Sequence, residues 1–212
     1  MITTLIFDLG GVVMTLDQEQ AIRRFADLGL ADARQRLDAY TQQGIFGDLE
    51  KGLITAEQFR DQLSTLVHRQ LTHEECTFAW RGYCREVPQR NLEAIVRLKQ
   101  KGYRVVLLSN TNPFMTSWTL TNDFDGGKHS LNYYFDHCYF SYELKVMKPD
   151  QQFFVKVLEA EQRQPDECLF VDDGERNVEA ARQLGIHTLM TENGEDWTRR
   201  LDNLLNEIEK QQ

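Results

Sequence analysis

Five short segments of the chain are rich in apolar and β-branched residues, and polar or glycine-containing stretches separate them. These segments are residues 4–9, 103–109, 137–141, 168–172 and 186–190. Each is a nearly continuous apolar run without strict alternation, which is typical of strands that are covered on both faces. Helical patterns lie between the later runs, at residues 89–101, 150–160 and 175–184. This alternation predicts an α/β fold with a Rossmann-like, doubly wound parallel sheet.

Residues 17–86 interrupt the alternation, because they contain helical patterns and no strand-like run. Two of the patterns, at 55–67 and 72–80, begin with the capping boxes Thr-x-x-Gln and Thr-x-x-Glu. Two earlier patterns are centred on Ile22 and Phe25 and on Leu37 and Tyr40. The sequence therefore predicts an all-helical cap of about four helices, inserted after the first strand. The expected boundaries are a core of residues 1–16 and 87–212 and a cap of residues 17–86.

The segment 121–135 has no helical or strand period and contains the pair Gly126 and Gly127. We expect a mobile loop there.

The chain is acidic. Its 212 residues include 33 acidic and 24 basic side chains, for a net charge of −9, so it lacks the basic face that binds nucleic acid. Its apolar runs are far shorter than the roughly 20 residues of a membrane-spanning helix, and no leader-like segment precedes the first run. We therefore expect a cytoplasmic protein without nucleic-acid or membrane partners, and the sequence leaves open whether it is a monomer or a homodimer.

Polar side chains stand at or after the ends of four predicted strands. These residues are Asp8, Ser109, Lys148 and the pair Asp172 and Asp173. Ligands of open parallel sheets bind outside the carboxyl ends of the strands, where these side chains would meet. The set therefore predicts a catalytic site at this edge.

Asp8 has two interpretations. The ordinary one is a carboxylate that accepts hydrogen bonds from loop amides. The functional one is a nucleophile, because a carboxylate can attack phosphorus and form an aspartyl-phosphate. Gly10 and Gly11 follow closely and would let the backbone approach a ligand or adopt a positive φ. On this hypothesis the strand aims the carboxylate and the glycines leave room for a phosphoryl group.

Ser109 and Lys148 have ordinary interpretations as well, a helix cap and a solvated surface charge. Functionally, the Ser109 hydroxyl and the amides after it could hold a phosphate oxygen, and Lys148 could neutralise charge on the transferred group. The adjacent carboxylates Asp172 and Asp173 repel each other unless a cation lies between them. Capping of the next helix explains one of them, and Mg²⁺, which prefers oxygen ligands, explains both.

These motifs together resemble the haloacid dehalogenase superfamily of hydrolases over nearly the whole chain. The stretches "LIFDLGGVV", "LLSNT", "KVMKPD" and "FVDDGERNVEAARQLG" are similar to its four motifs, in the family's order. The helical insertion is similar to the family's helical cap, and "LEKGLIT" at 49–55 resembles a turn common there. The resemblance implies a Mg²⁺-dependent phosphatase acting on a small phosphorylated metabolite.

The resemblance also implies residue roles. Asp8 would be the nucleophile, Ser109 and Asn110 would bind the phosphate, and Lys148 would stabilise charge. Gly10 would lie in the same substrate site.

The implied metal ligands are Asp8, Asp173 and the backbone carbonyl of Gly10, with Asp172 assisting. Family phosphatases usually have a second aspartate two residues after the nucleophile, which acts as general acid, and here that position is Gly10. General acid catalysis is worth about 10²–10⁴-fold. The D-x-G form resembles the branch that contains α-D-glucose-1-phosphate phosphatases, whose leaving group needs less protonation.

Other functions stay open. A metal-independent 2-haloacid dehalogenase also lacks the second aspartate, although the pair Asp172 and Asp173 has no clear use in metal-free chemistry. A phosphorylation switch similar to response-regulator receivers would have the motifs in a different order. A catalytically degenerate scaffold would bind phosphate without turning it over. Phe46 and neighbouring residues of the cap are candidates for contacts with the substrate. The loop residues Lys128 and His129 could also reach the site, although their ordinary interpretation is a place on the surface.

Overall fold

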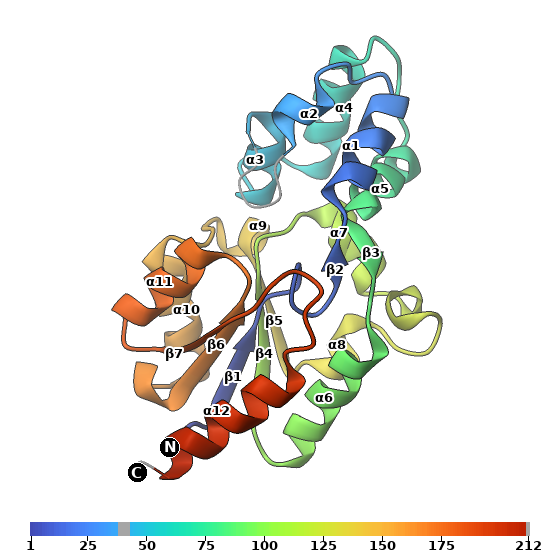
Figure 1. The fold of residues 1–212 in the computed structure, drawn as a ribbon. Helices are drawn as coiled ribbons and strands as arrows, with labels where there is room; N and C mark the ends of the chain where they lie inside the picture. The colour runs from blue at the N-terminus through green and yellow to red at the C-terminus, as the bar shows by residue number, and fades with distance from the viewer. Residues whose placement is uncertain (38–42, 211–212) are drawn as a thin grey trace.

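The five apolar runs form one parallel sheet in a computed structural model, which describes residues 1–37 and 43–210 (Figure 1). The strands are β1 (Thr4–Phe7), β4 (Arg104–Ser109), β5 (His137–Phe140), β6 (Cys168–Asp172) and β7 (His187–Met190). Their order is β5-β4-β1-β6-β7, and all neighbours are parallel. The order runs outward in both directions from β1, which confirms the predicted doubly wound sheet.

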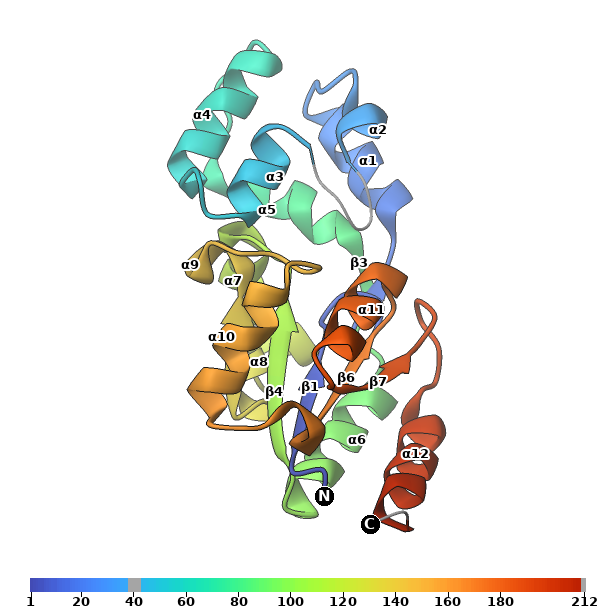
Figure 2. The same cartoon turned by 90° about the vertical axis from the view of Figure 1, so that its left-hand side faces the viewer.

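Helices cover both faces of the sheet (Figures 1 and 2). Leu5 and Phe7 of β1 belong to the core on one face and Ile6 to the core on the other, because successive side chains of a strand alternate. The first face packs against α6 (Gln89–Gln100), α8 (Leu131–Tyr134) and α12 (Thr198–Lys210). The second face packs against α10 (Gln151–Glu161) and α11 (Glu175–Gln183).

The segment between the first two sheet strands is helical, and Figures 1 and 2 place it beyond the carboxyl ends of the strands. Its elements are α1 (Gln18–Asp27), α2 (Ala33–Arg36), α3 (Ile45–Glu50), α4 (Ala56–Leu66), α5 (His73–Trp80) and the 3-10 helix η1 (Arg81–Tyr83). Both predicted capping boxes are present, at Thr55 and Thr72. The helix expected around Leu37 and Tyr40 is α2, which ends before Leu37, and Tyr40 lies outside the described residues.

An aromatic cluster forms the core of this helical segment. Phe25, Phe46, Phe59 and Trp80 pack with ring centroids 5.2 to 5.8 Å apart. Phe46 is fully buried there and does not line the cavity described below. The prediction that Phe46 contacts a substrate is therefore wrong, because it faces the interior of the cap.

Two short strands lie where the chain enters and leaves the helical segment. β2 (Thr15–Leu16) pairs antiparallel with β3 (Cys84–Glu86). The chain thus crosses between the two regions twice, side by side. We propose these crossings as the boundary between a core of residues 1–16 and 87–212 and a cap of residues 17–86.

The segment 121–135 is not the irregular loop that its composition predicted. It contains the 3-10 helix η2 (Asn122–Asp125) and α8, and it buries Phe124, Leu131, Tyr134 and Phe135. The Asp125 carboxylate accepts hydrogen bonds from the Tyr134 hydroxyl and from two backbone amides. Aromatic burial, which has no simple period here, gives this segment its structure.

Lys128 and His129, in the same segment, lie along α6 and not at the carboxyl edge of the sheet. They line a surface depression with Gln89 and Tyr133. The His129 ring contacts Asp125 at 3.2 Å. The structure therefore agrees with the ordinary interpretation, a place on the surface, and neither residue lines the cavity described below.

The remaining elements are short or terminal. They are α7 (Pro113–Thr119), α9 (Ser141–Leu144) and the 3-10 helix η3 (Pro165–Glu167). In the part of the chain that is described, no helix combines the length and the apolar character needed to cross a bilayer.

Candidate active site

Asp8 follows β1 directly and extends its pairing, since its backbone N–H donates to the Val171 carbonyl at 2.9 Å. Its side chain lines a cavity at the carboxyl edge of the sheet. Asp8 Oδ1 accepts a hydrogen bond from the Leu9 N–H at 2.6 Å and lies 2.9 Å from Lys148 Nζ. The carboxylate therefore meets a loop amide, as the ordinary interpretation expected, and a cation as well.

Lys148 is not a surface charge. Its ammonium has no exposed surface and contacts Asp8 Oδ1 at 2.9 Å and Asp172 Oδ2 at 2.6 Å. The Asn110 side chain fixes its backbone by accepting from the Lys148 N–H at 2.8 Å and donating to the Lys148 carbonyl at 2.9 Å. Burial lowers the pKa of Lys148, but Asp172 and Asp8 raise it by more, so the pKa stands above its ordinary value and the amine stays charged.

Asp172 and Asp173 differ in their surroundings. Asp172 is fully buried, and besides Lys148 it accepts from the Gly174 N–H at 2.7 Å and from Asn177 Nδ2 at 3.0 Å. Asp173 lines the cavity. Asp172 thus holds Lys148 in place from the protein interior, while Asp173 borders the cavity in which a ligand would bind.

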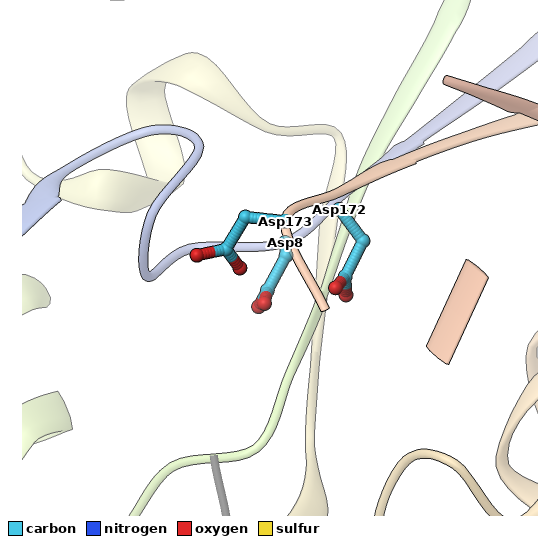
Figure 3. Close-up of side chains that lie close together, drawn as sticks. All are labelled: Asp8, Asp172 and Asp173. Atoms are coloured by element: carbon cyan, nitrogen blue, oxygen red, sulfur yellow. The ribbon is translucent and has the colours of Figure 1, made fainter. Parts of the chain in front are cut away.

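The three carboxylates of Asp8, Asp172 and Asp173 converge (Figure 3). One oxygen from each can be chosen so that all lie within 4.8 Å of one another. Burial raises the pKa of Asp8 well above its ordinary value, and Asp172 and Asp173 raise it further, against the lowering effect of Lys148. The one positive charge of Lys148 thus does not compensate the negative charges of three ionised carboxylates. The oxygen-rich donor set fits a hard divalent cation, which would favour the ionised form of each carboxyl.

The turn after Asp8 is shaped to admit Asp173. Gly11 has φ +76°, and a Cβ there would collide with the Asp173 carboxylate. Gly10 lines the cavity, and a Cβ on it would lie 3.1 Å from a Leu16 methyl group. The buried side chains of Asn91 and Trp197 both donate to the Val12 carbonyl, at 2.9 and 2.8 Å. Gly11 therefore makes room for a neighbouring acid, while Gly10 borders the open space.

Ser109 is the last residue of β4 and lines the same cavity. In the sheet, β4 lies on one side of β1 and β6 lies on the other. Asn110, Thr111 and Asn112 follow it along the wall. The Thr111 N–H donates to Ser141 Oγ at 3.0 Å, and Asn112 caps α7 by accepting from two backbone amides. The structure therefore brings Asp8, Gly10, Ser109, Asn110, Lys148 and Asp173 to one cavity.

The cap supplies the far wall of the cavity through Glu50, Trp80 and Tyr83. Sequence reasoning did not select these residues, nor Asn177, which holds Asp172. Asn177 lies within the quoted fourth motif, and Glu50 within the turn at 49–55, so a motif marked both positions. However, a glutamate or an asparagine in a sequence does not by itself show that its side chain will face a cavity.

A model of haloacid dehalogenase-like (HAD) hydrolases matches residues 2–185. The chain belongs to this family. The resemblance drawn from the four motifs is thereby confirmed at the level of the family, and the parallel sheet with its acidic edge is the HAD fold of this chain.

Two bacterial proteins are similar to this chain over nearly its whole length. D-ribitol-5-phosphate phosphatase of Bacteroides thetaiotaomicron is 45% identical over 206 residues, which are 97% of this chain and 100% of that protein. The structure of a HAD-like hydrolase of Porphyromonas gingivalis has a TM-score of 0.91 and 36% identity, covering 97% of this chain and 98% of its own.

A HAD family enzyme of B. thetaiotaomicron was crystallised with magnesium and inorganic phosphate. It has a TM-score of 0.86 and 35% identity, and covers 94% of this chain and 99% of its own. An L-2-haloacid dehalogenase structure is more distant, with a TM-score of 0.58 and 18% identity over 89% of this chain and 86% of its own. The likeness to the dehalogenase extends to the fold alone.

Proposed function

We propose that this HAD hydrolase is a Mg²⁺-dependent phosphatase that cleaves the phosphate ester of a small sugar alcohol, with Asp8 as the nucleophile. The observation that carries the proposal is the position of Asp8, which faces one cavity together with Asp173, Lys148 and Ser109. This set combines a nucleophile, metal-binding acids, a cation and a hydroxyl, and phosphoryl transfer requires such positioning and charge stabilisation.

In the proposed reaction an Asp8 carboxylate oxygen attacks phosphorus as the ester P–O bond breaks. Protonation of the departing ester oxygen gives the alcohol and leaves an aspartyl-phosphate, and water then hydrolyses the aspartyl-phosphate to return Asp8 and inorganic phosphate. Lys148, held by Asp172 beside Asp8, stabilises the charge on the phosphoryl oxygens. A Mg²⁺ ion held by Asp8, Asp173 and the Gly10 carbonyl, with Asp172 assisting, would supply further charge neutralisation.

Two observations support a sugar alcohol phosphate as the substrate. The relative that is 45% identical over nearly the whole chain is named a D-ribitol-5-phosphate phosphatase. Among the described residues that line the cavity, Lys148 is the only lysine or arginine, and it belongs to the phosphate end. The cap wall of Glu50, Trp80 and Tyr83 therefore suits a neutral hydroxylated chain. This replaces the sugar 1-phosphate suggested by the D-x-G motif.

The acidic cluster also argues against haloacid dehalogenation. Asp172 and Asp173 would add unneeded negative charge beside a nucleophile in metal-free chemistry, whereas a divalent cation uses both. Release of chloride from a 2-haloacid in the presence of a chelator would favour the dehalogenase instead.

A phosphate-release assay tests the proposal. The substrates are D-ribitol 5-phosphate, α-D-glucose 1-phosphate, glycerol 3-phosphate and p-nitrophenyl phosphate, each with Mg²⁺ and with EDTA. We expect turnover that needs Mg²⁺ and is fastest with the ribitol ester. Asp8→Asn should lower kcat by about 10³-fold or more, because it removes the nucleophile.

Asp166→Asn is the matched control. Asp166 is exposed in η3, just before β6 and at the opposite end of that strand from Asp172, so this variant should keep wild-type turnover. If Asp8→Asn is as active as the wild type, the assignment of the nucleophile is wrong. If none of the esters releases phosphate, the degenerate-scaffold alternative replaces the phosphatase.

A further inference from the structure

Glu50 is a buried acid that the proposed reaction has not used. It is the last residue of α3, has only 8% of its surface exposed, and lines the cavity that also holds Asp8, Ser109 and Lys148. Acids are rarely buried to this extent without an ion-pair partner. In the described part of the chain no lysine, arginine or histidine nitrogen lies within ion-pair distance of the Glu50 carboxyl.

The backbone around Glu50 is fixed to the catalytic core. Ser141 Oγ donates a hydrogen bond to the Glu50 carbonyl at 2.6 Å and accepts one from the Thr111 N–H at 3.0 Å. Thr111 is two residues after Ser109. Ser141 thus joins the end of α3 to the loop that follows β4.

Gly52 brings the turn after α3 against the core as well. It has φ +66°, and a Cβ at this position would collide with the Tyr142 carbonyl in α9. The helices α3 and α9 are in contact, and Figure 1 shows α3 on the side of the cap above α9. The Glu50 side chain is therefore held over the cavity by two separate contacts, rather than placed there by a free surface loop.

The environment of Glu50 keeps its proton in place at neutral pH. Burial raises the pKa of Glu50 from 4.5 to about 8, and the Asn112 side chain opposes this only in part. Among the described residues, Asn112 Nδ2 has no hydrogen-bond partner of ordinary geometry, so its amide stabilises the carboxylate weakly. The other ionisable groups that line the cavity are Asp8, Tyr83, Lys148 and Asp173.

We propose that Glu50 is the general acid of this hydrolase, donating its proton to the leaving oxygen and so replacing the acid that is missing at Gly10. This role rests on the proposed phosphatase function. As Asp8 bonds to phosphorus, the electron pair of the breaking P–O bond goes to the ester oxygen, which takes the Glu50 proton and leaves as the alcohol. The Glu50 carboxylate then takes a proton from the water that attacks the aspartyl-phosphate, which restores the acid.

The other cavity groups are less suited to this step. Lys148 is paired with Asp8 and Asp172, which raise its pKa, so it releases a proton poorly. Asp8 and Asp173 are needed in their ionised forms for attack and for metal binding. Tyr83 remains as the competing donor, and the experiment includes it.

The test compares two esters that differ in their need for a proton. D-Ribitol 5-phosphate releases an alkoxide unless it is protonated, whereas p-nitrophenyl phosphate releases a stable phenolate. Glu50→Gln should lower kcat on the ribitol ester by about 10²–10³-fold, within the usual worth of general acid catalysis, and leave kcat on the aryl ester within a few fold. Tyr83→Phe should not show this selectivity, and Glu159→Gln, at an exposed position on α10, should match the wild type.

The pH profile gives a second readout. In the wild type, kcat on the ribitol ester should fall as the pH rises through the Glu50 pKa of about 8, and this limb should be absent with the aryl ester and in Glu50→Gln. Equal losses on both esters, or a higher KM with unchanged kcat, would assign Glu50 to structure or substrate binding and overturn the proposal. A selective loss in Tyr83→Phe alone would assign the proton to Tyr83. A wild type that releases phosphate from neither ester would instead defeat the phosphatase function itself.

Discussion

Lys148 Nζ lies 2.6 Å from Asp172 Oδ2, and neither side chain has any exposed surface. The pair joins the segment after β5 to the end of β6 and holds the ammonium 2.9 Å from Asp8. A buried ion pair is poor support for stability by itself, but the removal of one partner leaves an uncompensated charge. Lys148 therefore contributes both to the stability of the folded protein, through its pair with Asp172, and to the proposed reaction, through its position beside Asp8.

Lys148→Gln tests this link. The variant removes the cation beside Asp8 and leaves Asp172 buried without its partner, so kcat should fall by about 10²–10³-fold and the free energy of unfolding by about 3–5 kcal/mol. Phosphate release and denaturant unfolding measure the two effects. Lys128→Gln, at an exposed position in the segment 121–135, is the control and should change neither. A fully active and stable Lys148→Gln variant would contradict the role given to this lysine.

Mg²⁺ should stabilise the fold, because it relieves the repulsion among Asp8, Asp172 and Asp173. We expect millimolar Mg²⁺ to raise the Tm of the wild type and EDTA to reverse the rise. Asp173→Asn should lose most of this shift, whereas Asp166→Asn should keep it. Differential scanning fluorimetry of the three proteins with Mg²⁺ and with EDTA measures these shifts in Tm, and a shift that persists unchanged in Asp173→Asn would show that the ion binds elsewhere.

The Glu50 carboxyl should make stability depend on pH. Its pKa rises from 4.5 to about 8 on folding, so between these values the folded chain holds a proton that the unfolded chain has lost. The free energy of unfolding therefore falls as the pH rises through this window and levels off above it. In Glu50→Gln this contribution is absent, so the Tm of the variant should fall less between pH 5 and pH 8 than the Tm of the wild type. For a chain of this size, each kcal/mol of unfolding free energy corresponds to a change in Tm of about 2–4 °C. Glu159→Gln should keep the wild-type slope, and identical slopes in all three proteins would contradict the buried, protonated state.

Gly11→Ala tests whether the turn after β1 serves Asp173. Gly11 has φ +76° and no room for a Cβ beside the Asp173 carboxylate. Gly126→Ala is a matched control, because Gly126 has φ +89° and a Cβ there would have no atom of residues 1–37 or 43–210 within 4 Å. Both variants should lose about 1–2 kcal/mol from the left-handed backbone, but only Gly11→Ala should also lose turnover and the Mg²⁺-dependent rise in Tm. If both variants keep turnover and the Mg²⁺-dependent rise in Tm, the left-handed backbone alone explains why residue 11 is a glycine.

Much of the fold could be predicted from the sequence, because its rules are local. Continuous apolar runs predicted all five strands of the sheet, and the residues just after them predicted its acidic edge. The missed elements have other causes. The segment 121–135 folds through the burial of Phe124 and Tyr134 and the hydrogen bonds of Asp125, which follow no period. The short strands β2 and β3 exist because the chain crosses between core and cap at one place, and two or three residues leave no pattern.

By itself, the sequence determined the α/β class, the helical insertion, the membership of the HAD family and the acids at the strand ends, since periodicity and motif order are properties of the chain. Tertiary structure alone decided which acids share a cavity, that Asp172 holds Lys148 while Asp173 lines the cavity, and that Glu50 lines the cavity with Asp8 whereas Phe46 of the same helix does not. These outcomes depend on contacts between residues far apart in the chain. Burial and neighbouring charge, not residue type, set the proton affinity on which the chemistry of Asp8 and Glu50 depends.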